Sequence, residues 1–112
     1  MEIHDERVGD TWVVTANGRL DGNASANFAD HAGRLIESTN PKLLIDFTGV
    51  DFVSSAGVWA VLHLSKRIKS AGGSFALCGV RDSVREVLDI SDFTSMFSIH
   101  RARAEAMAAM GK

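Results

Sequence analysis

Three consecutive apolar residues, Leu43–Ile45, lie within a segment of strand length, residues 42–47, which has Asp46 at its carboxyl end. A continuous apolar run of this length is typical of a central strand that is covered on both faces. Segments with helical spacing lie on either side of it, and alternation of strand and helix favours an α/β arrangement with some parallel pairing. We therefore expect an α/β fold with a mixed β-sheet of four to five strands, covered by about four helices.

Turn residues and periodicity predict the other elements. Gly9-Asp10 separates two strand-like segments, 2–8 and 11–17, and indicates an N-terminal β-hairpin. Gly18 is expected to end the second strand and to lead into a polar loop over 19–23. The remaining predictions are a helix over 24–38 capped by Asn23, a helix over 55–70, a strand over 74–80, a helix over 83–88 opened by a capping box, a short strand within 93–99 and a terminal helix over 101–110.

Length and composition indicate one domain, residues 1–112, of an ordinary soluble globular protein, with 46% hydrophobic and 23% charged residues. A net charge of −2 gives no electrostatic reason to bind nucleic acid. The first six residues are acidic rather than basic and then apolar, and no run approaches the roughly 20 apolar residues of a membrane span. We expect a cytoplasmic protein without membrane insertion, in which the single cysteine, Cys78, is a small core residue.

The sequence carries no pattern typical of an enzyme. The segment 53–57 lacks the first glycine of the nucleophile-elbow pattern Gly-x-Ser-x-Gly, and the four histidines show no pairing with its serines and no metal-ligand spacing. Gly72-Gly73 lack the Lys-Ser/Thr ending of a phosphate-binding loop. We expect no catalytic activity, no metal site and no cofactor.

Two serines, Ser54 and Ser55, open the helix over 55–70. A serine at a helix start is most often an N-cap, since its side-chain oxygen accepts a hydrogen bond from an unpaired backbone N–H. Two serines in a row leave one hydroxyl for another purpose, beside unpaired N–H groups and the positive end of the helix dipole. That position suits an added phosphate. From the residues alone, plain capping and a phosphate-acceptor site both remain open.

Phe52–Gly57, preceded by Leu44–Val50, resembles the signature of the STAS domain, a family that includes the bacterial anti-sigma-factor antagonists. Gly18–Asp21 and Ala71–Gly73 fall where that family has similar residues, and the resemblance covers the chain from about Ile3 to Ile99. It implies a single STAS-like domain over residues 1–112.

In this family the first residue of the helix after the turn is a serine or threonine that a partner kinase phosphorylates. The matching residue here is Ser55, with Ser54 as the second choice. The resemblance implies a partner that is both an anti-sigma factor and a serine kinase with a histidine-kinase-like ATPase fold. The unmodified antagonist binds it, phosphorylation releases it, and a metal-dependent serine phosphatase restores binding. The alternative is a non-switching STAS accessory or scaffold subunit of a larger signalling or lipid-transport complex.

Residues around the acceptor are expected to contact the partner. Asp21 either fixes its own turn or lies on the partner-facing rim, and Asp46 either accepts hydrogen bonds from the following turn or lies at the sheet edge where α/β folds place their sites. Trp59 either packs against a neighbouring loop or anchors a partner. The sequence departs from the family pattern at Ser54, where many antagonists have aspartate, and at Trp59, where a small residue is common. The predicted partner-binding residues are Asp21, Asp46, Ser54, Ala56, Gly57 and Trp59.

Overall fold

The computed structural model describes residues 1–36, 40–90 and 98–110. Within them the chain forms five strands and four helices, which confirms the predicted α/β fold and its mixed sheet. In chain order the elements are β1 (Glu2–Val8), β2 (Thr11–Leu20), α1 (Gly22–Gly33), β3 (Lys42–Val53), α2 (Ser55–Ser70), β4 (Ser74–Cys78), α3 (Asp82–Ile90), β5 (Ser98–His100) and α4 (Arg103–Met110).

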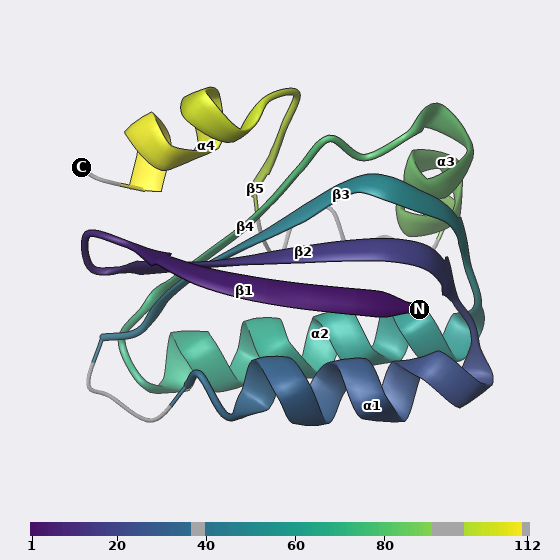
Figure 1. Cartoon of the computed structure of the whole chain (residues 1–112), viewed down its shortest axis with the longest axis horizontal. Helices are drawn as coiled ribbons and strands as arrows, with labels where there is room; N and C mark the ends of the chain where they lie inside the picture. The colour runs from purple at the N-terminus through teal and green to yellow at the C-terminus, as the bar shows by residue number, and fades with distance from the viewer. Residues whose placement is uncertain (37–39, 91–97, 111–112) are drawn as a thin grey trace.

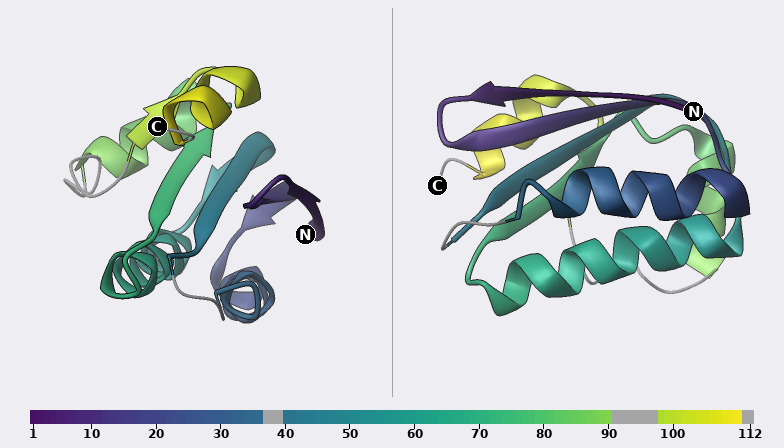
Figure 2. Two further views of the ribbon diagram at one scale, coloured as in Figure 1. Left: turned by 90° about the vertical axis from the view of Figure 1, so that its left-hand side faces the viewer. Right: turned by 60° about the horizontal axis from the view of Figure 1, so that its bottom comes forward.

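The strands lie in the sheet in the order in which they occur in the chain, β1-β2-β3-β4-β5. β1 and β2 form the predicted antiparallel hairpin, and every later pair is parallel. Helices α1 and α2 lie side by side on one face of the sheet, and α4 lies on the opposite face (Figures 1 and 2). The two N-termini of α1 and α2 are consequently brought to one end of the molecule.

β3 is the central strand that the apolar run predicts, and its core residues are buried on both faces. Ile45 and Phe47 belong to the large core that α1, α2 and α3 share, whereas Leu44 belongs to a smaller cluster beneath α4. The alternation follows from the two-residue period of a strand, which turns successive side chains to opposite faces. Both clusters therefore depend on β3.

The predicted end of this strand near residue 47 is wrong. β3 continues to Val53, in register with β2 as far as the pair Leu20–Val53, and leads directly into α2. Glycine is common in turns, but Gly49 lies within the strand and allows close packing, because a side chain there would overlap the Asn17 carboxamide of β2. The expected turn between this strand and α2 does not exist.

β2 also extends further than predicted. Gly18 does not end it but takes a φ of +112° at an irregularity in register between Gly18 and Arg19, and the strand then runs on to Leu20. A glycine accommodates such a φ without the strain that a side chain would cause. Residues 19 and 20, predicted as loop, are therefore part of the sheet.

The start of α1 is also corrected. The helix begins at Gly22 rather than residue 24, and Asp21 rather than Asn23 is its N-cap, with extended backbone angles and a side chain that accepts a hydrogen bond from Ala24 N at 3.0 Å. The helix ends at Gly33, and residues 37–38 of the predicted helix lie outside the described residues. An aspartate one residue before the helix outcompetes the later asparagine because its backbone already lies in the extended region that a cap requires.

The C-terminal predictions hold in outline. α3 starts at Asp82, with the Arg81 carbonyl accepting from Arg85 N at 2.8 Å, so Ser83 lies inside the first turn instead of capping it. β4 ends at Cys78, two residues earlier than predicted. The predicted last strand is present as β5, and its expected residues 93–97 lie outside the described part of the chain.

α2 spans the predicted residues, and Gly72, with a φ of +77°, follows its end. Cys78 is buried as expected, and burial raises the pKa of its thiol to about 11. Of the helices in the described ranges, none combines the length and apolar character needed to cross a membrane.

Candidate functional site

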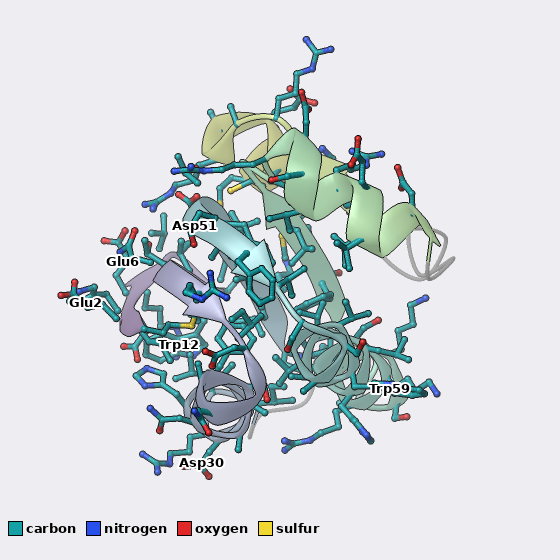
Figure 3. All side chains as sticks on the ribbon, turned by 90° about the vertical axis from the view of Figure 1, so that its right-hand side faces the viewer. Glu2, Glu6, Trp12, Asp30, Asp51 and Trp59 are labelled. Carbon is teal, nitrogen blue, oxygen red and sulfur yellow. The ribbon has the colours of Figure 1, made fainter. Side chains whose placement is uncertain are left out.

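The starts of α1 and α2 meet at one backbone carbonyl. Leu20 ends β2 and precedes the N-cap of α1, and its carbonyl accepts a hydrogen bond from Ser54 N at 2.9 Å. Ser54 in turn follows the end of β3 and precedes α2. The two N-caps, Asp21 and Ser54, thus lie next to each other. The end of the molecule at which α1 and α2 begin faces the viewer in Figure 3.

Ser54 is the N-cap of α2. Its backbone is extended, with φ −91° and ψ 174°, and its Oγ accepts a hydrogen bond from Gly57 N at 3.2 Å. The same hydroxyl donates to the Leu20 carbonyl at 3.3 Å, and the side chain is half-buried. The capping interpretation therefore applies to Ser54, whose hydroxyl already serves as donor and acceptor.

Ser55 is the first residue of α2 and is exposed. No hydrogen bond joins its hydroxyl to any residue in the described ranges. The first N–H groups of a helix have no partner within the helix, and the dipole makes this end positive. The Ser55 hydroxyl therefore lies at a point that accommodates negative charge, with solvent access for a modifying enzyme.

Gly57 allows α2 to start this close to the sheet. A Cβ at this position would lie 2.6 Å from the Leu20 carbonyl oxygen and 2.7 Å from a methyl carbon of Val53. Gly57 is buried beneath this contact, whereas Ala56 is exposed beside Ser55. Gly57 thus positions the site, and Ala56 lies on its surface.

Trp59 is 55% exposed, so its indole does not pack into the core. It lies four residues after Ser55, which places both side chains on the same face of α2. Its ring centroid is 6.5 Å from that of His63, one turn further along. Trp59 occupies the outer edge of α2 in Figure 3, where a docked partner would meet it.

Asp21 is half-buried and caps α1, so it fixes the turn before that helix, which was one of its two predicted roles. It also lies beside Ser54 and is therefore close to the candidate site. A capping carboxylate that is only half-buried keeps part of its surface available to a partner.

Asp46 is not at the site. It lies in the middle of β3, where its Oδ2 accepts from Arg103 Nη2 of α4 at 3.1 Å and its Oδ1 accepts from Thr48 N at 2.9 Å. Arg103 also bonds to Glu6 at 2.9 Å and to Thr15 at 3.2 Å. Burial raises the pKa of Asp46, but the hydrogen bonds from Thr48 and Arg103 outweigh burial and hold the pKa below its usual value. The expected place at a strand end is wrong, and Asp46 instead ties α4 to the sheet.

The STAS domain family matches residues 2–106 of this chain. The chain belongs to the STAS domain family. A Bordetella bronchiseptica protein described as a candidate anti-sigma factor antagonist, BtrV, is 34% identical over 109 residues, which are 97% of this chain and 94% of that protein. An anti-sigma-factor antagonist (STAS) domain protein from Planctomyces limnophilus has a similar structure, with a TM-score of 0.90, 26% identity and 98% of each chain covered. The phosphorylated form of the Bacillus protein SpoIIAA has the same fold, with a TM-score of 0.73, 21% identity and 96% and 98% of the two chains covered.

Two exposed residues beside the candidate site of this STAS domain, Arg19 and Phe52, were not among the predicted site residues. Arg19 and Phe52 pair in register across β2 and β3, and the Arg19 guanidinium carbon lies 4.0 Å above the centre of the Phe52 ring. Both side chains are exposed. Residue 19 had been placed in a loop, and only the extension of both strands brings the two side chains together. One sequence signal could have indicated this pair. Arg19 directly precedes Leu20 and Phe52 directly precedes Val53, and Leu20 and Val53 are apolar residues that pair across the two strands.

Beside Arg19 the STAS domain has an open cavity of about 440 Å³. It is lined by Met1, Arg19, Asp21, Asn23, Ala24 and Asn27.

Gly57→Ala is expected to lower the free energy of unfolding of the STAS domain by about 1–3 kcal/mol, because the new methyl group overlaps a backbone carbonyl that has no room to move. This expected loss is a net value, because the steric overlap outweighs the roughly 1 kcal/mol by which alanine normally stabilises a helix relative to glycine. Urea unfolding followed by tryptophan fluorescence measures it. Gly22→Ala is the matched control, since Gly22 also opens a helix and a Cβ there meets nothing within 4 Å. Equal stability of Gly57→Ala and wild type would contradict the packing argument.

Proposed function

We propose that this STAS domain is a phosphorylation-regulated protein-binding module that acts as an anti-sigma-factor antagonist in the cytoplasm. Its unphosphorylated form binds a cognate anti-sigma factor that is also a serine kinase, and phosphorylation of Ser55 releases it. The observation that carries this proposal is the division of roles between the two serines: the Ser54 hydroxyl caps α2, and the exposed Ser55 hydroxyl makes no hydrogen bond within the described ranges. The similarity to BtrV supports the same role.

The proposed reaction makes this chain a substrate. The Ser55 oxygen attacks the γ-phosphorus of ATP held by the kinase, the bond from that phosphorus to the β,γ-bridging oxygen breaks, ADP leaves, and a base of the kinase takes the hydroxyl proton. We expect a kinase with a histidine-kinase-like ATPase fold. Hydrolysis of the phosphoserine by a metal-dependent serine phosphatase regenerates the binding form.

Phosphorylation then changes binding without changing the fold. The phosphate adds about −1.5 to −2 charges at neutral pH, and the positive end of α2 tolerates this charge. A partner docked over Ser55, Ala56 and Trp59 has to accommodate a hydrated dianion inside its interface. That costs affinity wherever the facing surface is apolar or acidic.

The proposal is tested by site-resolved phosphopeptide mass spectrometry on the protein from its native cells, in growth and under stress. Trypsin releases residues 43–66 as one peptide that contains Thr48, Ser54, Ser55 and Ser65, so fragment ions that separate residues 54 and 55 are required. We expect phosphate on Ser55 with an occupancy that changes between conditions, and none in a Ser55→Ala strain. Phosphate on Ser54 instead would contradict the assigned acceptor. If neither serine carries phosphate under any condition, the proposed switch is refuted and a constitutive scaffold subunit is favoured.

A further inference from the structure

We propose that Arg19, stacked on Phe52, recognises a carboxylate of the partner that docks over Ser55. The inference rests on the proposed function and names the chemistry that the partner must present: an aspartate or glutamate side chain that enters the cavity beside Arg19 and pairs with its guanidinium.

The first argument is that Arg19 is prepared for a ligand. Its guanidinium lies 4.0 Å above the centre of the Phe52 ring, and within the described ranges neither an ion pair nor a hydrogen bond occupies it. A guanidinium stacked on an aromatic face keeps its five N–H donors at its edges, in a planar arrangement that matches a carboxylate. Stacking also restricts the long side chain in advance, so less entropy is lost when it binds.

The second argument is a contrast with another exposed arginine of the same sheet end. Arg81 also lies near β3, but its Nε donates to the Thr48 carbonyl at 3.1 Å, so it ties the loop before α3 to the sheet. Arg85 pairs with Asp89 one turn along α3 at 3.6 Å. Within the described part of the chain, Arg19 has no such internal role apart from its contact with Phe52, and Phe52 is 37% exposed.

The third argument is the chemistry of the adjoining cavity. Besides Arg19, the residues that line the cavity of about 440 Å³ include Asn23 and Asn27, whose carboxamides are of a type that can donate hydrogen bonds to a carboxylate. Its one acidic lining residue, Asp21, already accepts a hydrogen bond from Ala24 N, which offsets part of its charge. The cavity has room for an acidic side chain, and three of its lining residues, Arg19, Asn23 and Asn27, carry hydrogen-bond donors.

The fourth argument is location. Leu20, next to Arg19, accepts the hydrogen bond from Ser54 N, and Phe52 precedes Ser55 by three residues. A specific interface covers about 800 Å² of each partner, so a protein that covers Ser55 also reaches the Arg19 cavity. Charge pairing at such a position selects among possible partners, since a like charge facing Arg19 would be repelled.

The test uses the purified kinase and the full-length unphosphorylated protein in equilibrium binding titrations. Arg19→Gln should raise the Kd by about 10-fold, and Arg19→Glu by at least about 100-fold, because the second change sets two negative charges against each other. Lys69→Glu is the matched control, since this exposed lysine lies 14 residues after Ser55, about 21 Å along α2, and should change the Kd by less than about twofold. Circular dichroism shows whether each variant folds. If Arg19→Glu does not fold, the folded Arg19→Gln variant decides the question, because the salt dependence of its Kd should be weaker than that of wild type.

Charge-reversal variants of the kinase identify the acidic residue that pairs with Arg19. Acidic surface residues of the kinase are changed to lysine one at a time, and one of these variants should recover binding to Arg19→Glu while it loses affinity for the wild-type protein. If Ser55→Asp abolishes kinase binding but Arg19→Glu does not weaken it, the switch stands and the role of Arg19 is refuted. If Arg19→Glu leaves kinase binding intact and alters only the rate at which phosphoserine 55 is hydrolysed, Arg19 instead pairs with the protein's own phosphate. If Ser55→Asp binds as wild type does, the proposed function itself fails.

Discussion

Ser55→Asp is expected to weaken binding to the kinase by about 100-fold or more, a loss of about 2.7 kcal/mol, while the protein remains folded. The reason is local: the carboxylate sits at the first residue of α2, where the helix dipole stabilises it, but it presents a charge to any partner docked over this turn. Isothermal titration calorimetry measures the affinity, and circular dichroism and thermal unfolding report on the fold.

Ser55→Asn is the matched control for this prediction, because asparagine has nearly the shape of aspartate without its charge. It should retain an affinity within about tenfold of wild type, since only the size of the side chain changes. Ser54→Ala makes a second comparison, because loss of the N-cap should lower the free energy of unfolding by about 1 kcal/mol and leave an acceptor at residue 55. A Ser55→Asp protein that binds as tightly as Ser55→Asn would contradict a charge-based switch.

Ile45→Ala is expected to lower the free energy of unfolding by about 2–5 kcal/mol, which is a large part of the total stability of a domain this small. Ile45 is fully buried in the centre of β3, within the core that α1 and α2 cover. Truncating its side chain leaves a cavity between the sheet and the helices, and the close packing around it allows the neighbouring side chains to fill little of that space. Urea unfolding followed by far-ultraviolet circular dichroism measures the loss.

Val8→Ala is the control for this prediction, because Val8 is 43% exposed at the end of β1 and its truncation should change stability by less than about 0.5 kcal/mol. Leu44→Ala should also fall in the range of about 2–5 kcal/mol, although its side chain belongs to the separate cluster beneath α4. A loss below about 1 kcal/mol for both core variants would show that β3 is not the common support of the two clusters.

Local patterns predicted a large part of this fold. The hairpin follows from Gly9-Asp10 between two strand-like segments, and α2 follows from its serine start and its glycine end, all of which are features of neighbouring residues. The burial of β3 follows from Leu43–Ile45 for the same reason. Which of the two serines caps α2 required coordinates, because both suit an N-cap and only the extended backbone of Ser54 and its hydrogen bond from Gly57 N identify the cap.

Three of the errors share one physical cause: the role of a residue was decided by a distant segment. Gly49 resembles a turn residue until Asn17 of the adjacent strand occupies the space beside it. Asp46 resembles a residue at the end of a strand until Arg103, 57 positions later in the chain, supplies its ion pair. Arg19 and Phe52 are 33 positions apart, and neither residue alone indicates the stacked pair that they form.

The shared carbonyl of Leu20 has a consequence for the timing of the switch. Because the backbone and hydroxyl of Ser54 both bond to this carbonyl, and Gly57 packs closely against it, the docking surface is already ordered before a partner arrives. Little conformational rearrangement then delays association, and a change confined to one side chain of an ordered surface acts mainly on the dissociation rate. In the proposed switch, we therefore expect phosphorylation to act mainly by shortening the lifetime of the complex. If the proposed kinase and phosphatase act on Ser55, we expect their turnover rates, and not a refolding step of this protein, to set the response time.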